Sequence, residues 1–279
     1  MNDTSTTTKA SPPRKRSWLR LVIGGVLLVL IVAAGGIWWF LRDDAPAAVN
    51  LDAAVGAVQT TDASPAASPT GAPSASGAPS SSGAPSSSAA PASSGVAGQW
   101  AVDPNVGQFS FEDSTGTFVG FRVAEELTGL GSTTAVGRTP AVTGTMTIDG
   151  TTLTAASIVA DMTKLTTNDR RRDGPARRAL GTSEFPTATF TLTAPIELGD
   201  AAASGAKTTV SAAGDLTIKG VTKSVQFPLQ AQLTGDTVVV VGSLDVAFSD
   251  FGITPPTARV VVSVQDHGPI ELQLFFTRT

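Results

Sequence analysis

The sequence predicts an all-β domain preceded by one transmembrane helix and a disordered linker. Three observations lead to this organisation: residues 21–41 hold no ionisable side chain, residues 43–98 consist largely of Ala, Ser, Pro and Gly, and apolar and polar residues alternate along most of the chain after residue 99. Alternation with a period of two is typical of a strand that buries one face. Eight or so such strands, with no layer of helices to cover them, pack as a β-sandwich or close as a barrel.

The first apolar segment is long enough to cross a bilayer. At about 1.5 Å per helical residue, residues 21–41 extend roughly 32 Å. The basic residues that precede this run are Lys9, Arg14, Lys15, Arg16 and Arg20. Tryptophans lie near both of its ends, Trp18 before it and Trp38 and Trp39 near its end. We therefore expect a cytoplasmic basic tail at 1–17, a transmembrane helix at 18–42 and an extracytoplasmic domain after it. The alternative is a cleaved secretory signal, for which Ala45-Pro-Ala47 offers small residues.

Residues 43–98 form the predicted linker. Between Asp44 and Gly98 there is no Lys, Arg, Phe or Trp, and the unit Gly-Ala-Pro-Ser-x-Ser begins at Gly71, Gly77 and Gly83. Such a segment buries too little apolar surface to offset its ordering entropy. A random coil of about 55 residues spans roughly 40 Å on average, so the folded domain at 99–279 is expected to sample a shell above the membrane.

Composition removes several classes of function. The chain has no cysteine and a single histidine, His267, which excludes a thiol nucleophile and a metal site rich in Cys or His. From Trp100 onward there are 13 Lys and Arg against 18 Asp and Glu, an acidic balance that disfavours nucleic-acid binding. His267 falls in a turn with no nucleophile near it in the sequence, so no catalytic residue, cofactor or metal is expected.

The strands are predicted from apolar residues at alternate positions. In chain order the stretches are Val119, Phe121 and Val123; Val142, Met146 and Ile148; Ile158, Ala160 and Met162; Ala188, Phe190 and Leu192; Leu216 and Ile218 with Val225, Phe227 and Leu229; Val238, Val240, Leu244, Val246 and Phe248; and Val260, Val262 and Val264 with Ile270, Leu272 and Leu274. Asp149-Gly150 and Gly235-Asp236 indicate hairpin turns, and Asp266–Gly268 is expected to pair the last two strands. A short helix is expected at 175–180, with Pro175 in its first turn.

The apolar faces of these strands form the predicted interior. An eight-stranded barrel is wide enough to fill with its own side chains or to hold one small ligand, and the sequence leaves both possibilities open. The inferred inner face has no ionisable group, so a guest would be apolar. The predicted lining residues are Phe121, Met146, Ile158, Phe190, Leu192, Leu216, Ile218, Phe227, Leu229, Leu244, Phe248, Leu272 and Leu274.

Several motifs resemble the YceI family, and they follow the family's order over residues 99–279. They are Trp100-Ala-Val-Asp-Pro104, Asp169-Arg-Arg-Arg-Asp173, Phe185-Pro-Thr-Ala-Thr-Phe190, the hairpin Gly214–Leu229, Asp250-Phe-Gly-Ile253 and Ile270-Glu-Leu-Gln-Leu-Phe275. The resemblance implies a closed, eight-stranded lipocalin-like barrel that binds polyisoprenoid chains or similar amphiphilic lipids such as isoprenoid quinones. The family often carries a histidine shortly after its Arg-Asp pair, whereas this chain reads Asp173-Gly-Pro-Ala-Arg-Arg-Ala-Leu180, so a role of that histidine does not transfer.

The densest positive cluster lies in the longest connection without a strand pattern, at Arg170, Arg171, Arg172, Arg177 and Arg178. Guanidinium groups suit phosphate oxygens, so one hypothesis is that Arg170 and Arg177 hold an anionic lipid headgroup at the barrel mouth. The alternative is a solvated basic loop.

Together these features favour a membrane-tethered, extracytoplasmic and non-catalytic binding protein for an isoprenoid-type lipid. The alternative is a structural or interaction module of the cell envelope with a packed barrel. The sequence does not predict an oligomeric state.

Overall fold

The computed structural model describes residues 45–62, 95–111, 114–129, 131–257 and 261–279. The expected basic tail at 1–17 and transmembrane helix at 18–42 lie outside these residues, and so does the part of the expected linker at 63–94. Within the described ranges, no helix combines the length and the apolar character that a membrane crossing requires.

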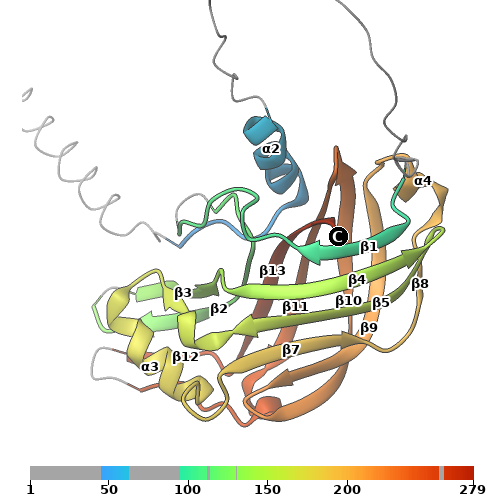
Figure 1. The fold of residues 1–279 in the computed structure, drawn as a ribbon. Coiled ribbons are helices and arrows are strands. Elements are labelled where there is room, and N and C mark those ends of the chain that lie inside the picture. The colour runs from blue at the N-terminus through green and yellow to red at the C-terminus, as the bar shows by residue number, and fades with distance from the viewer. Residues whose placement is uncertain (1–44, 63–94, 112–113, 130, 258–260) are drawn as a thin grey trace, which may run out of the picture. The chain divides into compact units, whose positions relative to one another are not determined.

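Eight antiparallel strands form a closed ring (Figure 1). In order around the ring they are β1 (Gly98–Val102), β4 (Val142–Asp149), β5 (Thr152–Asp161), β7 (Thr187–Leu192), β9 (Thr208–Ile218), β10 (Val221–Thr234), β11 (Thr237–Ala247) and β13 (His267–Arg278). The ring closes where β1 pairs with β13, with Trp100 opposite Arg278 and Val102 opposite Phe276. The predicted closed eight-stranded barrel is therefore confirmed. Closure satisfies the backbone groups that an open sheet would leave unpaired at its edges.

The strand β13 also carries a second, smaller group of strands. Its residues 270–273 pair with β2 (Phe118–Leu127), which pairs in turn with β3 (Gly131–Thr139) and with β12 (Val261–Val264). The short β6 (Thr166–Thr167) adds to β3, and β8 (Ile196–Glu197) adds to β5. Around one end of the barrel the wall therefore continues through β2 and β3 rather than through β1.

The hairpin between β9 and β10 depends on a two-residue turn. Ile218 pairs with Val221, and the two residues between them have positive φ angles, 51° at Lys219 and 74° at Gly220. Two positive φ angles define the type I′ turn, whose twist matches that of the flanking strands. Gly150 and Gly235, in the other two expected hairpin turns, also have positive φ. All three turns join the strands that the sequence indicated.

Some of the strand assignments were wrong. The last expected hairpin does not form, because β12 pairs with β2 while β13 pairs with β11 along its length. Phe248 and Met162 continue the apolar alternation in the sequence but lie in 3₁₀ turns, η2 (Phe248–Phe251) and η1 (Met162–Lys164). The strand β3 was not predicted, since Gly, Ser and Thr occupy most of its positions and hide the alternation.

The helix α3 (Arg170–Leu180) is longer than the expected helix at 175–180. The side chain of Asp169 caps its N-terminus by accepting a hydrogen bond from Arg171 N at 3.0 Å, and Gly181 ends it in a left-handed conformation with φ of 64°. Pro175 therefore lies inside the helix rather than in its first turn. A second short helix, α4 (Gly199–Ala203), follows β8.

The expected disordered linker does not extend over α2 (Leu51–Asp62). One face of α2 is apolar at helical spacing, through Leu51, Ala54, Val55 and Val58, and these side chains form a buried cluster with Val239, Val241 and Phe275 on the outside of the barrel. The cluster is separate from the main core inside the ring. The pattern was present in the sequence but was obscured by the Ala-rich composition around it.

Candidate functional site

The register of the ring decides which side chains face the interior. Side chains opposite one another in neighbouring strands share a face, and the pairs Phe190 with Leu216, Leu229 with Gly242, and Gly242 with Leu272 run continuously around the barrel. The same rule places every expected lining residue on the inner face except Phe248, which lies beyond β11 in η2. Phe121 is on that face through β2, opposite Ile270.

One end of the interior is filled and dry. Trp100 is 0% exposed and its indole Nε1 donates to the carbonyl oxygen of Val96 at 2.8 Å. The Arg278 guanidinium lies 4.4 Å from the centroid of the Trp100 ring and also donates to the Ala97 carbonyl. Around this tryptophan the inward side chains are buried, namely Met146, Ile148, Leu153, Ile196, Val238, Leu274 and Phe276. A ligand therefore has no room at this end.

The middle of the interior and the side of the ring opposite Trp100 are less tightly filled than the end around Trp100. Here many inward apolar side chains keep part of their surface accessible although the ring around them is closed, namely Phe121, Ile158, Phe190, Leu192, Leu216, Leu229, Leu244 and Leu272. Phe190 and Phe227 pack edge to face, with centroids 5.6 Å apart. Partly accessible apolar surface inside a closed ring is what a binding site for an apolar molecule requires.

An inner face without charged groups was predicted, but the structure places two charged residues on that face. Glu125 follows Phe121 and Val123 on the inward side of β2 and is 7% exposed. Lys223 lies opposite Leu216 and so also belongs to the inward side, at the exposed rim of the barrel. The prediction of an inner face without an ionisable group was therefore wrong at Glu125 and Lys223. The strand pattern had been followed only as far as Val123, and the carboxylate beyond it was missed.

Glu125 attaches α3 to the barrel. Arg172 Nε lies 3.0 Å from Glu125 Oε1, and Arg172 Nη2 donates to Oε2 at 3.1 Å. On the same helix, Ala176 and Leu180 pack against the inner core cluster. The helix α3 therefore covers part of the inner face at the end of the barrel opposite Trp100.

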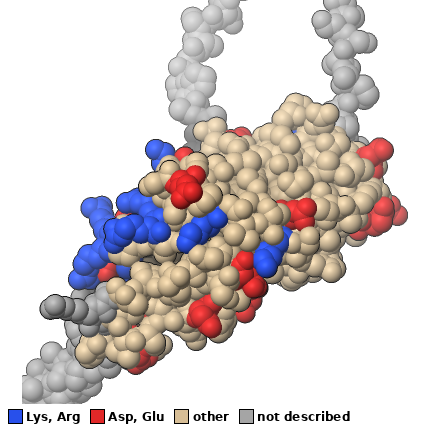
Figure 2. All heavy atoms as spheres, turned by 90° about the horizontal axis from the view of Figure 1, so that it is seen from below, with Lys and Arg blue, Asp and Glu red and all other residues tan. Residues whose placement is uncertain are grey.

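The other arginines of α3 have different surroundings. Figure 2 shows Lys and Arg side chains gathered over the region of the surface where Figure 1 places α3. Arg171 pairs with Asp169 at 2.9 Å, and Arg177 Nη1 donates to the carbonyl oxygen of Leu165 at 3.2 Å. Arg170 and Arg178 are exposed, and no ion pair involves either of them within the described residues. Of the two residues expected to hold a headgroup, Arg170 is thus available and Arg177 is engaged with the backbone.

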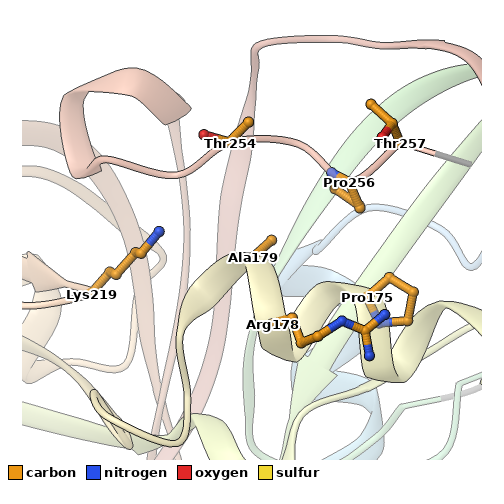
Figure 3. A pocket seen from close by; sticks show the side chains of 7 residues that line it. All are labelled: Pro175, Arg178, Ala179, Lys219, Thr254, Pro256 and Thr257. Carbon is orange, nitrogen blue, oxygen red and sulfur yellow. The ribbon is translucent and has the colours of Figure 1, made fainter.

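A hollow of about 390 Å³ lies beside α3, between the β9–β10 turn and the segment after η2. Its lining residues are Pro175, Arg178, Ala179, Lys219, Thr254, Pro256 and Thr257 (Figure 3). Lys219 and Arg178 stand on opposite sides of it in Figure 3. Lys219 Nζ donates to the carbonyl oxygen of Gly252 at 2.7 Å, which holds this side chain at the rim. Lys219 was not among the predicted site residues, because its place opposite α3 depends on the tertiary fold.

Two carboxylates near these elements have lowered pKa values. The hydrogen bond from the Arg171 side chain, together with the Arg171 backbone N–H, lowers the pKa of Asp169. The hydroxyl and backbone N–H of Thr163 do the same for the pKa of Asp161. His267 is exposed on β13, and its hydrogen bond with Asp266 raises its pKa. Across the described residues, no three or more His, Cys, Asp or Glu side chains are grouped as metal ligands.

The fold and this interior define a small antiparallel β-barrel with a dry end and a partly accessible apolar inner face. A family model described as YceI-like domain matches residues 100–276, and the chain belongs to that family. None of the curated proteins compared with the chain matches it.

The solved structures to which the chain is similar are distant from it in sequence. BcnA from Burkholderia cenocepacia is 18% identical, with a TM-score of 0.44 over 56% of this chain and 95% of that one. A polyisoprenoid binding domain from Saccharophagus degradans, implicated in plant cell wall breakdown, is 18% identical, with a TM-score of 0.48 over 64% and 98%. The YCEI protein of Campylobacter jejuni is 15% identical, with a TM-score of 0.43 over 51% and 84%.

Proposed function

We propose that the chain binds the apolar tail of an isoprenoid-type lipid inside its barrel, as a non-catalytic binding protein. The observation that carries this proposal is the partly accessible apolar surface of inward residues such as Phe190, Leu216 and Leu229 within a closed ring. Membership of the YceI-like family supports it, because the family resemblance implies a polyisoprenoid or isoprenoid-quinone ligand.

The energetics favour a chain-like apolar ligand. Burial of apolar surface contributes about 25 cal/mol per Å², and a chain of several isoprene units presents enough surface for many kcal/mol before ordering and desolvation costs are subtracted. The dry end around Trp100 would stop the tail, so the polar head would remain at the end near α3.

The two cations that line the hollow beside α3 are suited to an anionic head. Arg178 and Lys219 line the hollow beside α3 from opposite sides, and neither makes an ion pair within the described part of the chain. A guanidinium and an ammonium group placed in this way can each meet one side of a phosphate or diphosphate. The headgroup residues we propose are therefore Arg178 and Lys219, which line the hollow, whereas the expected Arg170 and Arg177 do not line it.

The membrane assignment completes the proposal. Residues 18–42 would anchor the chain, with 1–17 in the cytoplasm and the barrel domain outside it, because basic residues precede the apolar run. A barrel held at the membrane would take its ligand from the lipid phase beneath it.

The alternative function is an interaction module of the cell envelope with no ligand. The dry packing around Trp100 favours it for that end of the barrel, since these side chains leave nothing for a guest to occupy. The half-buried apolar residues in the middle of the barrel distinguish the two functions. An interaction module without a ligand has no use for accessible apolar surface inside the ring.

Native mass spectrometry of the full chain extracted from its own membrane tests the proposal. We expect an adduct with the mass of an isoprenoid amphiphile, and tighter binding of a polyprenyl diphosphate than of the corresponding neutral alcohol. Combining Arg178→Ala with Lys219→Ala should weaken diphosphate binding about tenfold or more and leave the alcohol unaffected, whereas Arg171→Ala is the matched control. Absence of any adduct, together with no uptake of either added lipid, would contradict lipid binding and favour the interaction module.

A further inference from the structure

A charge cluster is buried on the outer wall of the barrel. Glu271 on β13 and Arg138 on β3 are 2% and 3% exposed, and Arg122 on β2 donates through Nε to Glu271 Oε1 at 2.8 Å. Arg138 Nη2 lies 3.8 Å from Glu271 Oε2. One carboxylate therefore faces two guanidinium groups. Burial of the unmatched positive charge is costly unless other acceptors are supplied.

The chain segment before α2 supplies these acceptors. Arg122 Nη2 donates to the carbonyl oxygen of Pro46, and Arg138 Nη2 donates to that of Ala47 at 3.0 Å. In the opposite direction, the backbone N–H of Val49 donates to Glu271 Oε1 at 3.3 Å. The cluster thus binds an extended peptide backbone through both its donors and its acceptor.

The helix α2 extends the same contact over apolar surface. Its buried face rests on Val239, Val241 and Phe275, which are 0%, 4% and 0% exposed. Lys207 and Asp52 add an ion pair of 3.2 Å at the edge. Without α2 these barrel side chains would form an apolar patch on the outer wall, of the kind that marks an interaction surface.

We propose that residues 45–62 are a docking strap that keeps the barrel bound to the anchored part of the chain even without the covalent connection through residues 63–94. The inference rests on the anchoring at 18–42 in the proposed function. The strap follows that anchor in the chain, and its residues Pro46, Ala47 and Val49 are bound to the barrel. Residues 63–94 join the strap to β1, but the contacts of the strap with the barrel wall do not depend on that connection.

The strap makes a specific prediction about what happens when residues 63–94 are cut. In a full chain with a protease recognition sequence inserted after Ser82, the barrel fragment has no covalent link to the anchor once it is cleaved. We expect the barrel to stay in the membrane pellet after cleavage and to copurify with a tag on the N-terminal fragment, since the strap holds it without a covalent bond.

Two neighbouring alanines give matched variants. Ala54 is 2% exposed against the barrel, whereas Ala53 faces solvent, and the change to Asp alters helix propensity equally at both. Ala54→Asp should release most of the cleaved barrel, and Ala53→Asp should retain it as the unchanged chain does. Both changes lie in the strap, so the released barrel fragment keeps its native sequence and its thermal unfolding can be compared directly.

Three results would overturn the strap. The first is release of the unchanged barrel on cleavage, and the second is equal retention of the Ala53→Asp and Ala54→Asp chains. The third is retention only in a species of twice the expected mass, which would mean that the strap binds the barrel of a second copy of the chain. A failure of anchoring is distinguishable, because the uncut chain would then be absent from the pellet while the tagged fragments would still copurify.

Discussion

Arg172 and Glu125 form an ion pair that joins α3 to the inner face of β2, with Nε 3.0 Å from Oε1. Their side chains are 24% and 7% exposed. The two residues are far apart in the sequence, and their contact brings the basic helix over the accessible part of the interior.

Loss of the ion pair should loosen α3. Arg172→Met leaves the nearly buried carboxylate of Glu125 without its partner, at a cost of about 1 to 3 kcal/mol, since the pair is only partly buried. We expect amide hydrogen exchange in α3 to accelerate by about tenfold or more and exchange in β9 to stay unchanged. Arg170→Met is the control, because Arg170 is exposed and makes no ion pair within the described residues. Equal protection of α3 in both variants would show that the pair does not hold the helix.

Two alanines on the inner face of β5 separate filled from accessible space. Ala160 is 2% exposed, whereas Ala156 is partly accessible, and both face inward from the same strand. Ala160→Leu should overpack the core and lower the free energy of unfolding by about 1 to 3 kcal/mol. Ala156→Leu should cost less than that and should reduce uptake of a prenyl lipid, measured by native mass spectrometry. The opposite order of the two unfolding free energies would mean that the middle of the barrel is filled.

The turn at Lys219-Gly220 should be sensitive to an added methyl group. Gly220 has a φ of 74°, and a Cβ there would lie 2.6 Å from Phe185 Cε1. Gly150 has a φ of 60° with nothing within 4 Å of the same position. Gly150→Ala should cost about 1 kcal/mol from backbone strain alone, and Gly220→Ala should cost at least about 1 kcal/mol more. Chemical denaturation of both variants measures the difference, and equal losses would show that Phe185 moves aside freely.

The cap of α3 should weaken in acid. The pKa of Asp169 is lowered in the folded chain by the side chain of Arg171 and by its backbone N–H. The stabilisation is therefore fully present above the ordinary carboxyl pKa near 4 and is lost as the pH falls through the lowered value. Amide exchange of Arg171, corrected for its intrinsic pH dependence, should rise over that window. In Asp169→Asn the corrected exchange should be insensitive to pH there, and a pH dependence that survives in this variant would assign the effect to another group.

Much of the barrel could be predicted because strand geometry is simple. Side chains alternate between two faces with a fixed period, so Leu216, Phe227 and Leu272 are assigned to the interior by counting, and the register agrees. The turn glycines were recognisable for a similar reason, since a positive φ favours glycine. These features depend only on residues close together in the sequence.

The missed features depend on contacts between distant residues. Glu125 lies on an inward position that the apolar pattern did not reach, and its partner Arg172 comes from a helix that covers the mouth. Lys219 faces Arg178 only because the β9–β10 turn reaches α3 in the fold. Composition also misled, since an Ala-rich segment that reads as linker becomes an ordered helix when a barrel wall offers Val239 and Phe275 to its apolar face.

The seam between β1 and β13 has a consequence for folding. It joins Trp100 to Arg278, two of the most widely separated residues in the domain, so the contact order is high and ring closure is expected to be slow. A ribosome makes β1 long before β13, and until residue 278 has emerged the edges of β1 and β11 that pair with β13 have no partner. Exposed edges of that kind invite pairing with other chains, so the nascent domain is expected to depend on a chaperone until the last strand arrives.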